Sequence, residues 1–347
     1  MDFTPTEAQA EARDLAARVF ADLATPERLR AAGTGSDPEL WKALTAAGLV
    51  AAVADVGLLG LVLLLEEQGR ATAQVPYAAT CVYGLLAVAA HGTDEQRARL
   101  LPGIGDGSVV VAGAFPAQQG VRPSARGGLT GTVPVVPWLR DATHVLVADA
   151  GRRLRLVPLG EGTAVEAIEL TAPWSAARLT LHDAPAEPLG TAPEAGDPGA
   201  YADVLAVART AFAGLQAGVC AGSLARAVAH TNAREQFGRP LATRQAVQLR
   251  AADAHMDTEA IRVTAYEAAW RRDAGLPYAT HALTAAWWAS EAGQRVVHTG
   301  QHLHGGAGAD VGHPVHRHFL WGRQLDAYLG SGGEVLQELG ELITYGS

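Results

Sequence analysis

The sequence predicts an α+β protein in which an N-terminal helical domain, a small β domain and a C-terminal four-helix bundle follow one another. Three observations lead to this order. Apolar residues recur at helical spacing over the first hundred residues, then short β-branched segments alternate with Gly and Pro, and long alanine-rich stretches fill the remainder. We expect the domains to cover residues 1–102, 103–195 and 196–347.

Helix starts are marked by capping residues in the first domain. Thr4-Pro5-Thr6-Glu7 has the form of a capping box with proline at the first helical position, and Ser36-Asp37-Pro38-Glu39 repeats it. The apolar run from Gly48 to Leu65 contains Asp55 and glycines. It therefore predicts two buried pieces with a turn at Asp55-Val56-Gly57, not a membrane helix. Three further helices are expected: Leu58 to Arg70, Tyr77 to Ala90, and Asp94 to Leu101 capped by Thr93 and Gln96.

Strands are expected after Pro102, with a hairpin turn at Asp149-Ala150-Gly151. The predicted strands are Val109 to Val111, Gly128 to Val136, His144 to Ala148, Arg153 to Leu159 and Arg178 to Leu181. The segment from Thr191 to Gly199 is rich in Pro, Gly and acidic residues, so it predicts a linker.

Apolar stripes at helical spacing return in the last domain. They comprise Leu205, Ala208, Phe212, Leu215 and Val219; Val247, Ala251, Ala254 and Ile261; Ala282, Ala286, Ala289 and Val296; and finally Leu336, Leu339 and Ile343. Many residues on these faces are small, which allows helices to pack closely in a bundle.

Composition excludes several classes of protein. The net charge of −9 argues against nucleic acid as a partner, because that needs a basic face. Cys81 and Cys220 are the two cysteines and lie far apart in sequence, so neither a disulfide framework nor a cysteine metal site is suggested. The N-terminus opens with an acidic amphipathic helix, so we expect a cytoplasmic protein with no membrane partner.

The segment Arg234-Glu235-Gln236-Phe237-Gly238-Arg239-Pro240 breaks two helical patterns. Gly238 and Pro240 stop the helix and leave backbone N–H groups without helical partners, and Arg234 adds a fork of donors suited to phosphate. The segment resembles the acyl-CoA dehydrogenase family. There the turn grips the pyrophosphate of an FAD that is held mainly by a neighbouring subunit, which implies cofactor contacts from Arg234, Gln236, Phe237 and Gly238.

Other segments carry the same resemblance along essentially the whole chain. They are His91-Gly92-Thr93-Asp94-Glu95-Gln96 with Leu100-Leu101-Pro102 and Gly107; Gln245; and His302-Leu303-His304-Gly305-Gly306-Ala307-Gly308. The last resembles the family loop Gln-x-His-Gly-Gly-x-Gly, which closes over the ADP part of the neighbour's FAD. It implies contacts from His304, Gly305 and Gly306. His302 stands at the family's glutamine position and Gln301 precedes it, so either side chain is a candidate for the adenine.

The catalytic carboxylate of the family has no counterpart here. Tyr328-Leu329-Gly330-Ser331 stands where the family has Tyr-Glu-Gly-Thr, and leucine cannot accept the α-proton of an acyl thioester. The family's alternative base position falls near Ala208. In the β domain, two segments stand where the family seats its flavin: 114–120 replaces a Thr-Glu-x-x-Gly-Ser-Asp loop, and 133–138 replaces a Trp-Ile-Thr strand. Two prolines in the latter predict an edge or irregular strand.

The donated half of a flavin site is thus present and the chain's own half is degraded. This pattern is similar to the short non-catalytic chains of actinobacterial α2β2 acyl-CoA dehydrogenases that act on steroid side-chain CoA thioesters. The resemblance implies an acyl-CoA substrate, a longer homologous catalytic subunit, FAD shared across the interface, and electron-transfer flavoprotein or a similar acceptor.

Three alternatives remain open. Glu334 could be a displaced base in a self-sufficient homotetramer, or a carboxylate that favours the start of a helix. Crowded histidines suggest a metal site, with His298 and His302 one turn apart, although a phosphate-facing or interface role is favoured. Their positions are 298, 302, 304, 313, 316 and 318. Finally, the Arg234 turn could serve subunit packing alone in a scaffold without a ligand.

Overall fold

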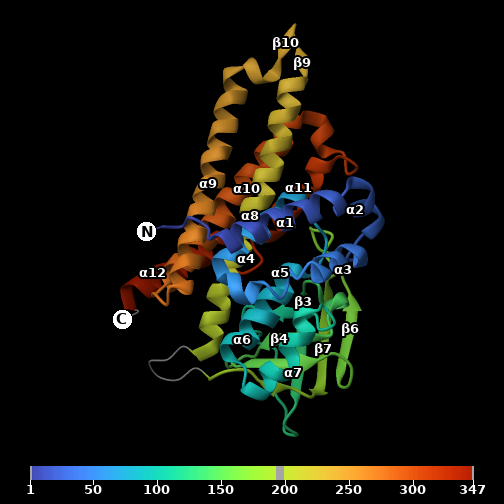
Figure 1. Ribbon diagram of the computed structural model, residues 1–347, viewed down its shortest axis with the longest axis vertical. Coiled ribbons are helices and arrows are strands. Elements are labelled where there is room, and N and C mark those ends of the chain that lie inside the picture. The colour runs from blue at the N-terminus through green and yellow to red at the C-terminus, as the bar shows by residue number, and fades with distance from the viewer. Residues whose placement is uncertain (1, 193–198, 346–347) are drawn as a thin grey trace. The chain divides into compact units, whose positions relative to one another are not determined.

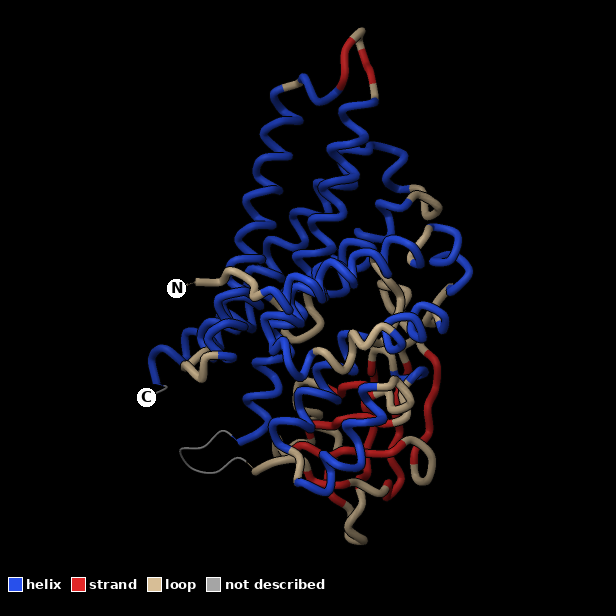
Figure 2. The backbone as a smooth tube through the Cα atoms, viewed as in Figure 1, coloured by secondary structure: helices blue, strands red, loops and turns tan. Residues whose placement is uncertain are grey.

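The computed structural model describes residues 2–192 and 199–345, and the chain divides into two compact units. One unit contains the chain up to Pro26, residues 58–73 and the chain from Arg209 onward; the other contains residues 27–57 and 74–208. Figures 1 and 2 show helices first, then strands, then long helices, so the predicted α+β class is confirmed. Most of the linker predicted over 191–199 lies outside the described residues.

The first helices begin at side-chain caps, although one predicted cap is wrong. The helices are α1 (Glu7–Leu23), α2 (Pro26–Ala32), α3 (Pro38–Ala46) and α4 (Val53–Ala71). Thr6, not Thr4, caps α1, because Thr6 and Gln9 exchange reciprocal hydrogen bonds of 2.9 and 3.3 Å. Asp37 caps α3 by accepting from two backbone N–H groups, and Pro38 is the first helical residue as predicted.

The predicted break in the apolar run is confirmed at Gly57, whose φ of 71° interrupts α4. The N–H groups of Leu58 and Leu59 then need new acceptors, and both donate to the Asp273 carboxylate at 2.9 Å. Asp273 ends α9 (Gln245–Asp273), so one helix end caps the restart of another. Burial raises the pKa of this carboxyl group.

The helix predicted over Tyr77 to Ala90 contains a π-helical segment that the sequence pattern did not reveal. It consists of α5 (Tyr77–Ala79), the π-helix η1 (Thr80–Leu86) and α6 (Ala87–His91). The following helix, α7 (Asp94–Gly105), begins at the predicted capping box of Thr93 and Gln96 and continues past Pro102.

Two four-stranded sheets form the β domain. The first has the order β1 (Val111–Ala114), β4 (His144–Ala148), β5 (Leu154–Pro158), β8 (Glu187–Pro188), and the second has the order β2 (Arg122–Pro123), β3 (Leu129–Val136), β7 (Ala177–Ala184), β6 (Thr163–Ala167). Strands β1 and β4 are parallel and the other pairs are antiparallel. Four of the five predicted strands are confirmed, whereas the one predicted over Val109 to Val111 is displaced to Val111–Ala114. Strands β2, β6 and β8 were not predicted.

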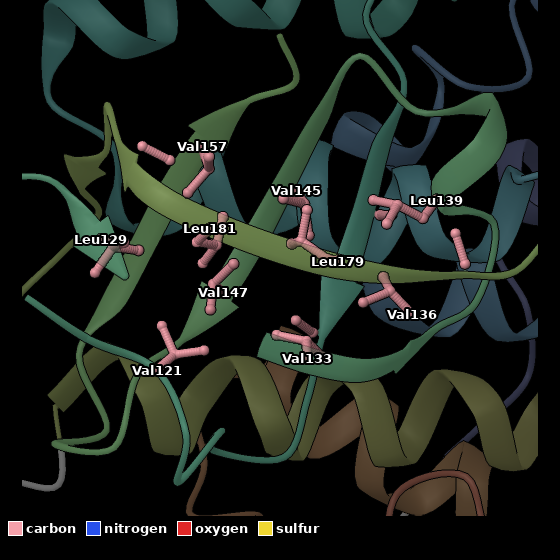
Figure 3. Packing of buried hydrophobic residues seen from close by; sticks show 14 residues of the cluster. Val121, Leu129, Val133, Val136, Leu139, Val145, Val147, Val157, Leu179 and Leu181 are labelled. Atoms are coloured by element: carbon pink, nitrogen blue, oxygen red, sulfur yellow. The ribbon is translucent and has the colours of Figure 1, made fainter. Parts of the chain in front are cut away.

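Alternate residues of these strands fill one buried core, as Figure 3 shows. Val145 and Val147 of β4 and Leu179 and Leu181 of β7 have the period of two that places side chains on one face. The predicted turn at residues 149–151 joins β4 and β5, where the Asp149 carboxylate accepts from the backbone N–H groups of Gly151 and Arg153.

Long helices make up the remainder of the chain. They are α8 (Gly199–Ala233), α9, α10 (Ala279–His304), α11 (Pro314–Leu325) and α12 (Gly332–Tyr345). Glycine permits the close packing that the small residues predict: a Cβ on Gly218 of α8 would lie 2.1 Å from the Glu66 carbonyl oxygen of α4. By length and composition α8 could cross a bilayer, but 94% of its most apolar window is buried in the structure, as in the core helix of a soluble protein.

The stripe predicted at the C-terminus is wrong in part. Val335 is buried, whereas Leu336 and Ile343 are 52% and 68% exposed. The face of α12 that packs against the rest of its unit is thus rotated from the predicted one, because Gly332 starts the helix with Val335 already inward.

Candidate functional site

The segment from Arg234 to Pro240 forms a hairpin beyond the ends of α8 and α9, as Figure 1 shows. Strands β9 (Glu235–Gln236) and β10 (Arg239–Pro240) pair antiparallel, with Gln236 opposite Arg239. Phe237 and Gly238 make the turn at φ 56° and 74°. Positive φ at both central residues matches the twist of the flanking strands. Glycine is favoured at position 238 by its positive φ and not by close packing, because a Cβ there would meet nothing within 4 Å.

Phe237 is the most exposed large apolar residue that the structure describes, at 91%. An exposed phenylalanine forgoes about 2 kcal/mol of burial, and positive φ on a residue with a Cβ costs about 1 kcal/mol more. Such a combination is typical of a residue that becomes buried against a binding partner.

Three arginines surround this turn, and the sequence analysis singled out one of them. Arg234 and Arg239 are exposed. Arg244, which was not predicted, donates from Nη2 to the Gln236 carbonyl oxygen at 3.1 Å and lies over the Phe237 ring at 5.3 Å. Its Nε is buried and has no hydrogen-bond partner among residues 2–192 and 199–345. Arg244 directly precedes α9, and that position was the signal that could have revealed it.

This donor set fits a pyrophosphate. Guanidinium groups bind phosphate oxygens through paired N–H donors. The helix α9 opens at the exposed Gln245, and the side chain at its N-cap makes no capping hydrogen bond. A long helix whose first N–H groups lack a side-chain cap favours an anion at that end.

A second loop follows α10 in the same unit. The α-helix ends at His304, Gly305 has φ 61°, and the 3₁₀ segment η4 covers Gly305–Ala309. Gln301 donates from Nε2 to the Gly308 carbonyl oxygen at 3.1 Å, so its amide holds this loop. His302 is exposed and lines a pocket of about 840 Å³ between α9 and α10. Of the two candidates for the adenine, His302 therefore has the accessible side chain.

The two exposed glycines of this loop have open space around them. A Cβ on Gly305 or Gly306 would meet nothing within 4 Å, whereas a Cβ on Gly308 would lie 2.5 Å from the Gln301 carbonyl oxygen. Packing within the chain thus requires Gly308. Packing does not require a glycine at position 306. A glycine in open space is typical of a backbone that a ligand approaches closely.

Leu329, which the sequence analysis matched to the family's base position, is buried. The guanidinium of Arg209 on α8 donates from Nε to the Leu329 carbonyl oxygen at 3.4 Å, and its two Nη atoms contact both carboxylate oxygens of Glu338 at 2.8 and 2.7 Å. Ala208, at the alternative base position, is also buried. Glu338 is therefore engaged in a bidentate ion pair. That Leu329 and Ala208 mark the family's two base positions stays a prediction from the sequence.

Glu334 occupies a helix start. Its Oε2 accepts from the backbone N–H and the hydroxyl of Ser331, both at 2.8 Å, and the first of these is one of the two hydrogen bonds of a capping box at the start of α12. The hydrogen bond from the Ser331 backbone lowers the pKa of this exposed carboxyl group. A lowered pKa makes Glu334 a weaker base.

Two backbone donors of the loop 114–120 in the β domain are occupied. The N–H of Ala117 donates to the Tyr201 hydroxyl at 3.2 Å, and that of Gln118 donates to the Ala148 carbonyl oxygen at 2.8 Å. Phe115 is stacked between Tyr83 and Tyr201 at 5.0 and 6.0 Å. These donors are thus committed within the domain, as are the ring faces that flank the loop.

Strand β3 is irregular, as the prolines of the segment 133–138 predicted. Strand β3 shifts register against β7 between Val133 and Val136, and Pro134 lies in that interval. Trp138 beyond it is fully buried, with φ 58°, and stacks on Trp174 at 4.3 Å. Two indole rings therefore fill this part of the domain.

The histidines do not form a metal centre: the described part of the chain has no group of three or more His, Cys, Asp or Glu placed to hold a metal ion. His298 packs edge-on against Phe319 at 4.9 Å. His318, expected to face phosphate or an interface, is instead buried, with its ring nitrogens 3.1 and 3.0 Å from the carbonyl oxygens of Pro314 and Arg70. That prediction is wrong because helical periodicity turns residue 318 inward.

Comparisons with known proteins agree with this architecture. Residues 6–108 match the family model for the acyl-CoA dehydrogenase N-terminal domain, and residues 200–339 match that for the acyl-CoA dehydrogenase C-terminal domain. Acyl-CoA dehydrogenase FadE27 from Mycobacterium tuberculosis is 33% identical over 98% of both chains.

Two solved structures are similar over nearly their full length. A variant of the Tcur3481-Tcur3483 steroid ACAD has a TM-score of 0.90 and 41% identity, covering 98% of both chains. The ChsE4-ChsE5 complex from Mycobacterium tuberculosis has a TM-score of 0.89 and 31% identity, covering 99% of both chains. Members of the matched family are FAD flavoproteins and oxidoreductases. With both terminal domains matched and relatives aligned end to end, the chain belongs to the acyl-CoA dehydrogenase family.

Proposed function

We propose that this chain is the partner subunit of a heteromeric FAD-dependent acyl-CoA dehydrogenase, lacks the catalytic carboxylate, and completes the flavin site of a longer homologous catalytic subunit. The observation that carries the proposal is the hairpin of Arg234 to Pro240. It presents a 91% exposed Phe237 in a strained conformation beside Arg234, Arg239 and Arg244, none of which forms an ion pair within residues 2–192 and 199–345. A surface of this kind fits a role in a neighbouring subunit's site.

The residues of this chain would hold the dinucleotide part of FAD. Arg234 and Arg244 supply charge-assisted donors for the pyrophosphate, and Phe237 supplies an aromatic face against the partner. His302 and the Gly305–Gly306 backbone supply the surface for the adenosine end. When bound, FAD supplies the hydride acceptor for α,β-dehydrogenation of the acyl-CoA.

The contacts around Leu329 support the proposal that this chain does not remove the α-proton of the acyl thioester. Arg209 is held by Glu338 and by the Leu329 carbonyl oxygen, so the Glu338 carboxylate is already neutralised. The occupied donors of the loop at Ala117 and Gln118 support the absence of a flavin ring seat in the β domain.

The substrate and the assembly follow by analogy. The similar structures are described as a steroid ACAD and as a ChsE4-ChsE5 complex. We infer an α2β2 heterotetramer in the cytoplasm that acts on steroid side-chain CoA thioesters and passes electrons to electron-transfer flavoprotein or a similar acceptor.

A self-sufficient homotetramer with Glu334 as base is the second candidate. Glu334 lies near the family base position, but its Oε2 accepts both hydrogen bonds from Ser331 and its pKa is lowered. Because proton abstraction tolerates little misplacement, we favour the heteromer.

Purification of this chain alone, and together with its longer homologue, tests the proposal. The chain alone should neither retain FAD nor reduce an acceptor with an acyl-CoA, whereas the co-purified pair should do both. An acyl-CoA-dependent activity of the isolated chain would refute the proposal.

A further inference from the structure

Three histidines from three separate elements stack beside the glycine loop. His230 lies on α8, His304 ends α10, and His313 caps α11. The ring centroids of His230 and His304 are 4.6 Å apart with an interplanar angle of 27°, and those of His304 and His313 are 4.9 Å apart at 62°. We call these three residues the histidine stack.

Hydrogen bonds define the tautomers of two of these rings. Nδ1 of the buried His304 lies 2.7 Å from the Gly300 carbonyl oxygen, which can only accept, so Nδ1 carries the proton. Nδ1 of His313 accepts from the Val315 backbone N–H at 3.2 Å, so the proton of the neutral ring lies on Nε2. His304 is the last residue of α10, and the loop η4 begins at the next residue, Gly305.

The charged groups around the stack disfavour protonation. His304, His313 and Arg234 oppose added positive charge on the His230 ring. His304 and Arg226 oppose it on the His313 ring, where the Asp310 carboxylate favours it. Burial, followed by these neighbours, lowers the pKa values of His230 and His313. Adjacent imidazolium rings would repel across less than 5 Å.

We propose that His230 and His313 are positioning residues that hold His304, and through it the loop Gly305–Ala309, only while their own two rings are neutral, so that FAD retention by the complex falls on acidification. This inference rests on the proposed function, because the loop must contact the dinucleotide for retention to change. It assigns no catalytic role to the three residues. Their effect reaches the cofactor through the backbone of the loop.

The test measures release of FAD from the assembled complex by flavin fluorescence between pH 7.5 and 5.5. For the wild type we expect the apparent Kd for FAD to rise about tenfold over this range, because protonation sets in below the ordinary histidine pKa of about 6.5. His230→Phe retains a ring for stacking but cannot titrate, and should flatten this profile. His313→Asn retains a capping acceptor for Val315 and loses the ring, so it should weaken retention at both pH values.

Two further variants separate failure of this inference from failure of the proposed function. His182→Asn changes an exposed histidine of β7 and should leave the wild-type profile unaltered. A wild-type profile without pH dependence, tighter retention in acid, or a His230→Phe profile equal to the wild type would each overturn the inference. If Arg234→Ala still abolishes retention in those cases, the proposed function stands; if Arg234→Ala retains FAD fully, the proposed function fails instead.

Discussion

Arg209 of α8 binds both carboxylate oxygens of Glu338 on α12 through its two Nη atoms, and its Nε donates to the carbonyl oxygen of Leu329. The ion pair thus holds the segment around Leu329, which the sequence analysis matched to the family's catalytic segment. Arg209 is buried while the Glu338 side chain is about half exposed. The two partners therefore have unequal access to water. Loss of the Glu338 carboxylate leaves a buried charge unpaired, whereas loss of the Arg209 guanidinium leaves a charge that water reaches.

Glu338→Gln should destabilise the chain by about 1–3 kcal/mol, because it leaves the charge of the buried Arg209 without its carboxylate. Chemical denaturation of the purified chain measures this value. Glu341→Gln, an exposed change one turn further along α12, is the matched control and should alter the free energy of unfolding by less than about 0.5 kcal/mol. Equal effects of the two variants would show that the ion pair contributes nothing specific.

Leu329→Glu should not make the chain an active dehydrogenase. The backbone donors of Ala117 and Gln118 would remain occupied within the domain and could not hold a flavin ring. The substitution should lower the free energy of unfolding, because a carboxylate would enter a buried position. Acceptor reduction with an acyl-CoA checks the first expectation. Activity of the isolated variant would mean that the flavin seat is intact after all.

Glu334→Gln distinguishes a cap from a base. A capping role predicts that the complex keeps its kcat, with a loss of about 1 kcal/mol in stability. Loss of activity by several orders of magnitude, in a folded variant, would identify Glu334 as the proton acceptor.

Sequence patterns predicted the order of domains, the break at Gly57 and the cap at Thr93 because each depends on local chemistry. The π-helical segment 80–86 and the short strand β6 were missed. Their conformation depends on packing partners far along the chain, which single-sequence patterns do not contain. The cap at Thr6 was misplaced because two overlapping segments both satisfied the capping pattern.

The candidate site was predicted in outline from two glycine-containing turns. Arg244 was missed, because its position directly before α9, which could have revealed it, was not used. Its approach to Phe237 arises from the hairpin geometry. Whether Gln301 or His302 is accessible was also undetermined until the bond from Gln301 to Gly308 was known.

His318 gives the chain a specific pH dependence of stability. Burial lowers the pKa of His318 to about 4, against about 6.5 in the unfolded chain. The unfolded state therefore binds more protons between these values, and the free energy of unfolding should fall by about 3 kcal/mol as pH decreases from 6.5 to 4.

Denaturation at several pH values, compared with His318→Gln, checks this expectation. The variant keeps an amide donor for one carbonyl oxygen and should show a shallower decline. His182→Gln, which changes an exposed ring, should decline as the wild type does. A variant His318→Gln with the wild-type slope would assign the acid sensitivity to other groups.

Arg234→Ala should weaken FAD binding by the complex about 10- to 100-fold, because charge-assisted hydrogen bonds contribute about 1.5–3 kcal/mol each. Each chain should remain folded, since Arg234 is exposed. Equilibrium dialysis of FAD measures the change, and Arg178→Ala on β7 is a control in an exposed ion pair. Unchanged affinity would remove Arg234 from the cofactor site.

The most direct measurement is the number of flavins in the assembled particle formed with the longer homologous chain. A subunit that donates to a neighbour's site without seating a flavin ring predicts one FAD for each pair of unlike chains. One FAD for each chain, or FAD retained by this chain when purified alone, would contradict the account.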